Sequence, residues 1–353
     1  MTRPPGLPRL QLRTPADVLA AVPYLFGFHP IDSVVLLGLR DTALVFHARC
    51  DLPAAKAPSG EVLALGEYLT QVLLAQTANA VLLVAFGPAE RATPVLLATA
   101  QTMEAAGLAV LDQLRATDGR YWSHLCPDPS CCPADGVAYD VEGTVVAAEA
   151  TLAGCVALPD RETLVRTLGP PEGNALAAIL RETRAATARL GERPAGESRH
   201  TGQATLDTAV NRYLSGGRLA DDELAWLTVL FQDGQQLRDD GLLAIEAAPV
   251  QSALAAAHLA LWTDVVRRCD PAVVVGPAVL LAYACWRVGD GVRSGVAVER
   301  ALATDPHCPA ATLMAELLRR GVPPVVADRP GGDPKPRPRR RRRRERRRTR
   351  TTR

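Results

Sequence analysis

Strand-like segments occur only in the N-terminal part of this 353-residue chain, and this asymmetry constrains its fold more than any other feature. Apolar runs bounded by turn residues, which are typical of buried strands, alternate there with segments of helical periodicity. From Glu142 onward nearly every segment has helical periodicity. A chain of this length also exceeds one ordinary core. The pattern therefore predicts an α/β domain over residues 1–160, an all-helical domain over 161–325 and a tail over 326–353.

The expected elements follow from apolar periodicity and from the turn residues between them. The first helix begins after Thr14 as N-cap, with Pro15 and Asp17 in its first turn. Pro23 is expected to end or kink this helix. The predicted strands are Ser33–Leu39 and Ala43–Cys50 as a hairpin, Ala80–Phe86, Leu108–Thr117 and Arg120–Cys126. The other predicted helices are Glu61–Thr77, Glu90–Ala106, Glu142–Val156, Glu162–Leu168, Asn174–Leu190, Ala204–Leu214, Asp221–Phe231, Ala253–Cys269, Val273–Val288, Arg293–Ala303 and Pro309–Arg319. The polar segment Gly191–Gln203 is predicted to be a linker or surface loop.

The last predicted helices carry a repeat-like pattern. Gly289, Ala301 and Pro306 stand where a tetratricopeptide unit has its turn glycine, packing alanine and closing proline. Two Asp-Pro pairs, at 270–271 and 305–306, lie 35 residues apart, close to the period of that unit. Stacked repeats need about three units. The pattern therefore predicts one tetratricopeptide-like hairpin, and a true repeat array stays the weaker alternative.

The segment CPDPSCCP, residues 126–133, combines three cysteines and three prolines shortly after a histidine. Cysteine and histidine are the donors that a tetrahedral Zn²⁺ ion takes in proteins. The candidate zinc ligands are His124, Cys126, Cys131 and Cys132. Zinc sites usually have two separated Cys-x₂₋₄-Cys pairs, so a distant residue such as Cys155 is an alternative ligand.

Two further interpretations of this segment stay open. A redox role requires a lowered thiol pKa, from an arginine such as Arg120 or from a helix N-terminus. A structural role requires only that the prolines restrict the backbone and that the cysteines fill space as small apolar residues. The sequence favours a rigid structural loop and leaves zinc as the sharper alternative.

The segment GFHPIDS, residues 27–33, offers a second candidate site through His29, Asp32 and Ser33. The members of a catalytic triad come from separate elements so that they can align, and the chain has no G-x-S-x-G motif. The segment is more typical of a turn in which Asp32 or Ser33 accepts hydrogen bonds from backbone amides. If it lines a cleft, His29 is the acid/base candidate, because histidine titrates near neutral pH.

Charge is distributed very unevenly along the chain. The net charge of +2 divides into +12 for the last 19 residues, which hold one lysine, twelve arginines and one glutamate, and −10 for the other 334. Such a run is predicted to be disordered and to attract phosphate groups in a salt-dependent interaction. It contains no aromatic residue on which bases could stack, so the interaction would be blind to sequence. Alternatively, the tail folds back on the acidic body or only reflects an arginine-rich composition.

No export signal or membrane anchor is expected. The first residues are polar and interrupted by prolines. The uncharged stretch Pro271–Trp286 is shorter than the roughly 20 residues of a membrane span. We therefore predict a cytoplasmic protein whose eight cysteines are reduced thiols.

Two stretches resemble one known family. They are TPADVLAAVPYLFGFHPIDSVVLLGLR near the N-terminus and RYWSHLCPDPSCCP followed by Gly136. Both are similar to an uncharacterised, mainly actinobacterial family, known as domain of unknown function four-one-nine-two. The resemblance runs from about Leu12 to about Pro324 and leaves out the arginine-rich tail. It implies a bacterial, cytosolic setting, and it implies no activity, cofactor or catalytic residue.

These observations predict a non-enzymatic interaction or regulatory module. The helical part would present a groove to a protein partner, and the tail would bind nucleic acid or another polyanion without sequence preference. The alternative is an enzyme of unrecognised type, with its site between the GFHPIDS turn and the cysteine loop. No P-loop, G-x-G-x-x-G, H-E-x-x-H or EF-hand motif points to a known reaction. Zinc is the one cofactor that the pattern supports.

Overall fold

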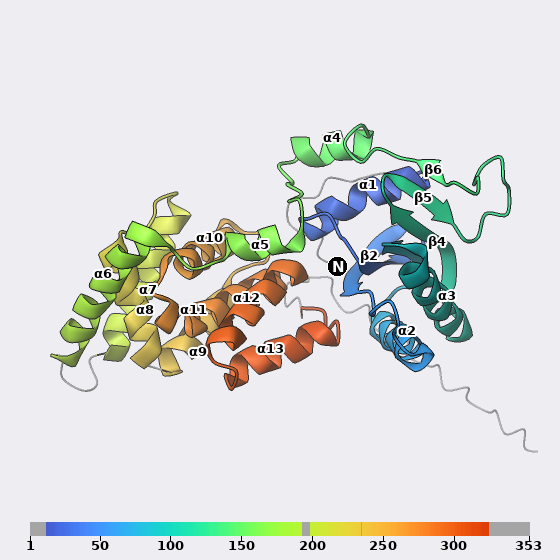
Figure 1. The fold of residues 1–353 in the computed structure, drawn as a ribbon. Coiled ribbons are helices and arrows are strands. Elements are labelled where there is room, and N and C mark those ends of the chain that lie inside the picture. The colour runs from blue at the N-terminus through green and yellow to red at the C-terminus, as the bar shows by residue number, and fades with distance from the viewer. Residues whose placement is uncertain (1–11, 193–197, 234, 325–353) are drawn as a thin grey trace, which may run out of the picture.

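Six strands form one mixed sheet in the order β2-β1-β3-β4-β5-β6 (Figure 1). The computed structural model describes residues 12–192, 198–233 and 235–324. The strands are β1 (Ser33–Arg40), β2 (Ala43–Asp51), β3 (Ala80–Phe86), β4 (Ala109–Thr117), β5 (Arg120–Ser123) and β6 (Val137–Ala138). The central pair β3 and β4 is parallel, and every other neighbouring pair is antiparallel. The predicted mixed sheet is therefore confirmed.

Both predicted hairpins are present, β1 with β2 and β4 with β5. Asp118 and Gly119 connect the second pair with φ angles of 49° and 69°. Two consecutive residues with positive φ match a type I′ turn, whose twist fits that of the two strands. Asp-Gly accepts this backbone at low cost, because aspartate tolerates the left-handed region and glycine has no Cβ. The turn directs the chain from β5 into the cysteine loop.

Helices cover both faces of the sheet. The helices beside it are α1 (Pro15–Phe26), α2 (Ser59–Leu74) and α3 (Ala89–Ala105), and α4 (Val145–Leu152) packs on α1. Val34 and Leu36 of β1 belong to the apolar cluster that α2 and α3 complete. Val35 and Leu37 belong to the cluster that contains the apolar residues of α1. Successive side chains of a strand point to opposite faces, which explains why β1 is a continuous apolar run.

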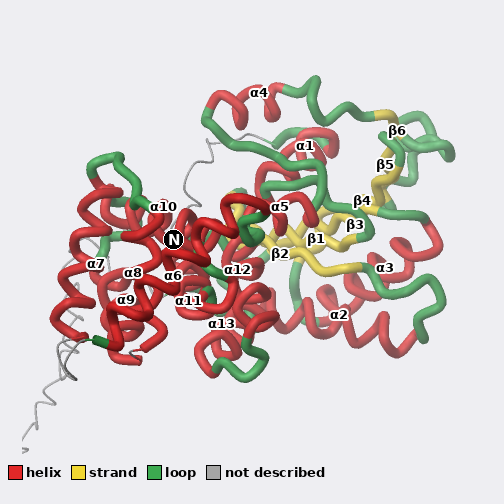
Figure 2. Tube along the Cα trace, turned by 60° about the vertical axis from the view of Figure 1, so that its left-hand side comes forward, coloured by secondary structure: helices red, strands yellow, loops and turns green. Residues whose placement is uncertain are grey.

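Every described element after β6 is helical, and Figure 2 shows most of these helices gathered on one side of the sheet. They are α4, α5 (Arg161–Thr167), α6 (Gly173–Gly191), α7 (Ser198–Leu214), α8 (Asp221–Asp233), α9 (Gln235–Ala247), α10 (Ala253–Arg268), α11 (Val275–Arg287), α12 (Gly291–Thr304) and α13 (Pro309–Arg319), with a 3₁₀ turn at Pro271–Val273. Helices α11 and α12 are joined at Gly289, whose φ is 84°. The hairpin is present, and its tetratricopeptide character stays a prediction.

Three expected boundaries differ from the structure. Pro23 lies inside α1, which continues to Phe26, because the other hydrogen bonds of the helix and its capping box at Thr14 hold it together. Helix α7 begins at Ser198, inside the predicted linker Gly191–Gln203. Helix α4 is shorter than the predicted segment 142–156.

Two elements were not predicted. Strand β6 has only two residues and depends on pairing with β5, so it has no local signal. Helix α9 contains Gly241 and a polar first half, which hide its periodicity. A Cβ at Gly241 would lie 3.1 Å from Leu280 and 3.2 Å from Phe231, so tertiary packing favours glycine there. Tertiary contact thus overrides local propensity in both cases.

The chain after α13 returns to the sheet. The Tyr68 hydroxyl of α2 donates to the carbonyl oxygen of Arg319 over 2.5 Å, and Gln76 Nε2 donates to that of Gly321 over 2.7 Å. Trp286 Nε1 of α11 donates to the carbonyl oxygen of Val322 over 2.9 Å. The end of α13 therefore bonds to α2, and the segment that follows α13 bonds to the residues just after α2 and to α11.

The predicted disordered tail, residues 326–353, lies outside the described residues. Within the described part of the chain, none of the helices combines the length and the apolar character that crossing a membrane requires.

Candidate metal site

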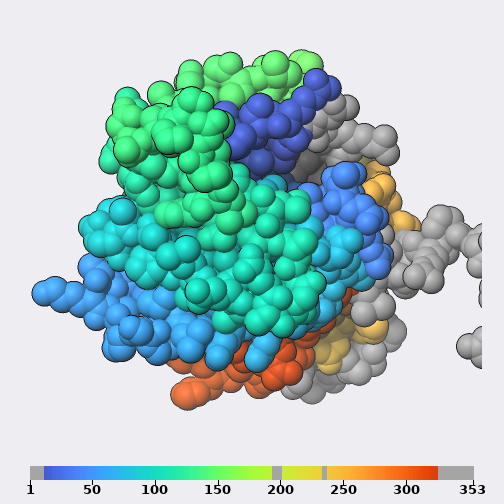
Figure 3. All heavy atoms as spheres, turned by 90° about the vertical axis from the view of Figure 1, so that its right-hand side faces the viewer, coloured from blue at the N-terminus to red at the C-terminus, as the bar shows by residue number. Residues whose placement is uncertain are grey.

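The cysteine loop connects β5 to β6 at one edge of the sheet, and it projects from the sheet in Figure 1. Figure 3 shows the green segment that contains it at the surface of the molecule, beside α1 in dark blue. Its base is fixed by Trp122, whose Nε1 donates to the carbonyl oxygen of Ala134 over 3.0 Å. Gly136 has a φ of 80°, and a Cβ there would lie 2.6 Å from the Trp122 ring. Glycine is therefore required at the point where the loop passes this ring.

The two ends of the loop hold their cysteines through backbone hydrogen bonds. The Ser123 hydroxyl accepts from the amide of Cys126 over 3.2 Å and donates to Asp112 over 2.6 Å. The carbonyl oxygen of Asp128 accepts from the amides of Cys131 and Cys132, over 3.1 and 2.7 Å. These bonds wind residues 128–132 into one helix-like turn, in which neighbouring side chains diverge by about 100° rather than the 180° of a strand. The adjacent cysteines can therefore face the same space.

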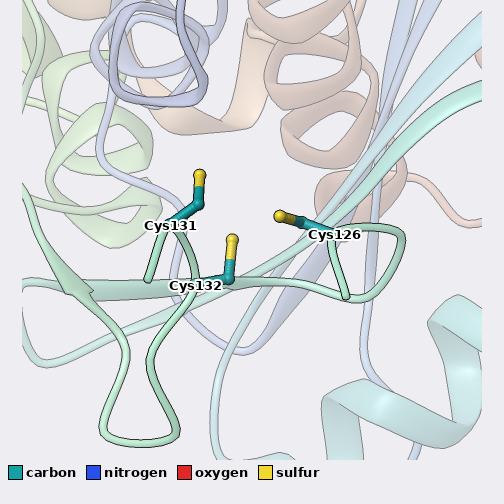
Figure 4. Close-up of side chains that lie close together, drawn as sticks. All are labelled: Cys126, Cys131 and Cys132. Atoms are coloured by element: carbon teal, nitrogen blue, oxygen red, sulfur yellow. The ribbon is translucent and has the colours of Figure 1, made fainter. Parts of the chain in front are cut away.

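Three of the four predicted zinc ligands lie together. The Sγ atoms of Cys126, Cys131 and Cys132 all lie within 4.8 Å of one another. Figure 4 shows the three sulfur atoms directed into one common space from the two limbs of the loop. In a tetrahedral zinc–thiolate site with Zn–S bonds of about 2.3 Å, the sulfur atoms are about 3.8 Å apart. Small side-chain adjustments would bring the three Sγ atoms from separations of up to 4.8 Å to this spacing.

The histidine is not part of this group. The His124 amide donates to the carbonyl oxygen of Gln113, which continues the β4–β5 ladder one residue beyond β5. Burial and the charge of Arg115 lower the pKa of the His124 ring, while Asp112 opposes them. The ring therefore lies near side chains of β4, and Cys155 is likewise outside the thiol group.

The surroundings distinguish the thiols chemically. A hydrogen bond from the backbone of Asp128, assisted by the Cys132 thiol, lowers the pKa of Cys126. The hydrogen bond to Cys126 and desolvation raise the pKa of Cys132 to about 11. The surroundings thus favour the thiolate of Cys126 over that of Cys132, and a cation would stabilise two or three thiolates together.

The GFHPIDS segment has a different geometry from the one expected. The Ser33 hydroxyl is buried, donates to the carbonyl oxygen of Ile31 over 2.6 Å and accepts from Arg49 Nε over 2.8 Å. Asp32 pairs with Arg91 over 2.7 Å. Arg91 also donates to the carbonyl oxygens of residues 52 and 53, so it joins this turn to the end of β2. The side chains of Asp32 and Ser33 are therefore bonded to two arginines. Local sequence does not reveal these arginines as their partners.

A cavity of about 580 Å³ lies between α6, α7 and α8. Trp226 forms part of its wall, and the guanidinium of Arg189 lies 4.2 Å from the centre of that ring. Thr205 and Thr208 of α7 face it together with Asp222 of α8. A groove is predicted in the helical half, but no pattern in the sequence indicates this position.

The fold and the loop define a class of protein with a mixed α/β sheet, a helical half and a surface cluster of thiols. The chain belongs to the family described as Domain of unknown function (DUF4192), whose sequence profile matches residues 15–325. This confirms the resemblance carried by the N-terminal stretch and the cysteine loop. No curated protein and no solved structure matches the chain.

Proposed function

We propose that this protein is a non-enzymatic regulatory module that binds zinc at the cysteine loop. The observation that carries the proposal is the convergence of three Sγ atoms, all within 4.8 Å of one another, from residues 126, 131 and 132. Thiolates select zinc and other soft ions over magnesium or calcium, which prefer oxygen donors. All eight cysteines are free thiols, as a zinc site in a reducing cytoplasm requires.

A regulatory role is better supported than an enzymatic one. The alternative enzyme would use the GFHPIDS turn, but Asp32 and Ser33 already bind arginines there. A serine nucleophile needs an exposed hydroxyl beside a base, whereas Ser33 is buried. The proposed division of labour places the metal in residues 1–160 and the partner surface in the helices of 161–325.

Zinc binding is tested by competition with a chromogenic chelator, using the reduced full-length protein. We expect one zinc ion per chain. Cys126→Ser removes a ligand, so it should weaken zinc binding by about 100-fold or more, which exceeds the usual effect of losing a residue that only hydrogen-bonds to a ligand. Cys155→Ser is the matched control, because Cys155 lies outside the thiol group, and it should bind zinc like the wild type. Equal zinc affinities of Cys126→Ser and Cys155→Ser would exclude the site.

The cavity between α6, α7 and α8 is the proposed surface for a protein partner. Its volume of about 580 Å³ and its mixture of Trp226, an arginine and hydroxyl groups are typical of pockets that fix a bound segment. Thr205→Arg would fill it. If a partner captured by the wild type binds this variant equally well, the partner uses another surface.

The arginine-rich tail is the proposed polyanion contact. Its support is the charge of the sequence, +12 in the last 19 residues. Binding of the full chain to heparin should weaken steeply with salt, whereas a chain that ends at Pro324 should show a much shallower slope. Equal slopes would show that the tail does not make the contact.

A further inference from the structure

The thiol cluster has three protein donors among the described residues. Among the described residues, the group whose ligand atoms all lie within 4.8 Å contains no other cysteine, histidine, aspartate or glutamate. Structural zinc sites are closed by four protein ligands, whereas sites with three protein ligands keep a position for an external donor. The number of donors therefore bears directly on what the site does.

Asp128 and His124, which lie close to the cysteines in the sequence, have hydrogen bonds of their own. Asp128 Oδ1 accepts from the amide and the hydroxyl of Ser130, over 2.8 and 2.7 Å. The His124 amide is bonded to Gln113 of β4, so the backbone that carries the ring is committed to the sheet. Asp128 would have to give up its bonds to Ser130 to reach the sulfur atoms, and the His124 ring lies outside the group of three thiols.

The loop also keeps its shape through its own hydrogen bonds. The Arg120 guanidinium donates to the carbonyl oxygens of Asp135 and Gly136, over 3.1 and 2.7 Å. With the bonds from Trp122 to residue 134 and from Cys131 and Cys132 to Asp128, both limbs are fixed by the protein. These hydrogen bonds hold the three thiols in place from the protein side.

From these observations, and resting on the proposed zinc binding, we infer that the site is a three-thiolate centre whose fourth position accepts a neutral nitrogen donor of the imidazole type from outside the chain. Three thiolates on Zn²⁺ leave a charge of −1, and a fourth thiolate would raise it to −2. Arg120 cannot offset that charge, because it pairs with Asp135 over 3.2 Å. A neutral donor adds no charge, and imidazole is a common zinc ligand. The zinc would thus link this protein to a histidine of a partner.

The experiment uses Co²⁺ as a spectroscopic replacement for zinc in the reduced full-length protein, with imidazole as the probe. We expect a Co²⁺–thiolate charge-transfer band, and a saturable change of the visible d–d bands as imidazole is added. His124→Ala and His124→Gln should show the same starting spectrum and the same response as the wild type. Circular dichroism confirms that both variants are folded.

Two results would overturn the inference while leaving zinc binding intact. One is a changed Co²⁺ spectrum in the folded His124 variants before imidazole is added, which would make His124 the fourth ligand. The other is a wild-type spectrum that imidazole does not alter, which would mean that the position is closed. The absence of any thiolate charge-transfer band would instead overturn the proposed zinc site itself, and the inference with it.

Discussion

The cysteine loop and the core of the helical half place the same side chain in opposite surroundings. Cys269 and Cys285 are fully buried among helices. Burial raises the pKa of Cys269 to about 12, and it raises the pKa of Cys285 as well. In the loop Cys131 is exposed, and the Asp128 backbone lowers the pKa of Cys126. An apolar core makes a thiol inert packing material, whereas a turn of backbone amides prepares it to bind a cation.

Alkylation should show the largest difference between the two regions. Iodoacetamide should modify Cys131 in the native protein at least about 10³-fold faster than Cys285, because a core thiol reacts only when the structure opens. Quantitative peptide mass spectrometry after timed labelling measures both rates. Similar rates at the two cysteines would mean that the helical core is not closed.

Serine substitution of a cysteine should lower the free energy of unfolding more in the helical core than in the cysteine loop, and this difference is smaller than the one in alkylation rate. Cys285→Ser puts a hydroxyl into an apolar site and should lower the free energy of unfolding by about 1–3 kcal/mol. Cys131→Ser, at the surface, should change it by no more than about 0.5 kcal/mol. Urea unfolding of the metal-free proteins gives both values, and a larger loss for Cys131→Ser would contradict the comparison.

The histidines extend the comparison to pH. His258 is buried in α10, and burial lowers its pKa to about 4, whereas an unfolded histidine titrates near 6.5. Between these values the unfolded state binds more protons, so His258 makes the fold lose stability as the pH falls from about 6.5 toward 4. The loss begins below about pH 6.5 and is complete below about pH 4. It should reach roughly 1–2 kcal/mol at pH 5 after allowance for solvent screening.

Urea unfolding at pH 7.5 and pH 5 measures this effect in the wild type and in His258→Leu. The leucine variant removes the titrating ring and should lose less stability between the two pH values. Arg287, which lines the same small cavity as His258, is unchanged in both proteins. Identical losses would show that His258 is not the group responsible.

The sheet could be predicted largely from local sequence, but the candidate site could be predicted only in part. The runs at β1 and β3 and the turn at Asp118-Gly119 carry their own signals, since buried strands and type I′ turns are encoded in adjacent residues. Spacing alone does not show that the adjacent Cys131 and Cys132 occupy a helix-like turn, in which both can face one metal ion. His124 lies outside the group, and its amide continues the β4–β5 ladder, which spacing does not show either.

The partners of polar side chains could not be predicted from the sequence either. Asp32 and Ser33 looked like possible catalytic residues, and their partners Arg91 and Arg49 lie on other elements. Long-range ion pairs of this kind have no local pattern, so the turn could be predicted and its partners could not.

X-ray absorption spectroscopy of the zinc-loaded full-length protein tests the three-thiolate centre most directly. We expect three sulfur scatterers at about 2.3 Å and one lighter atom at about 2.0–2.1 Å from the metal. Four sulfur scatterers, or a first shell without sulfur, would contradict the proposed centre.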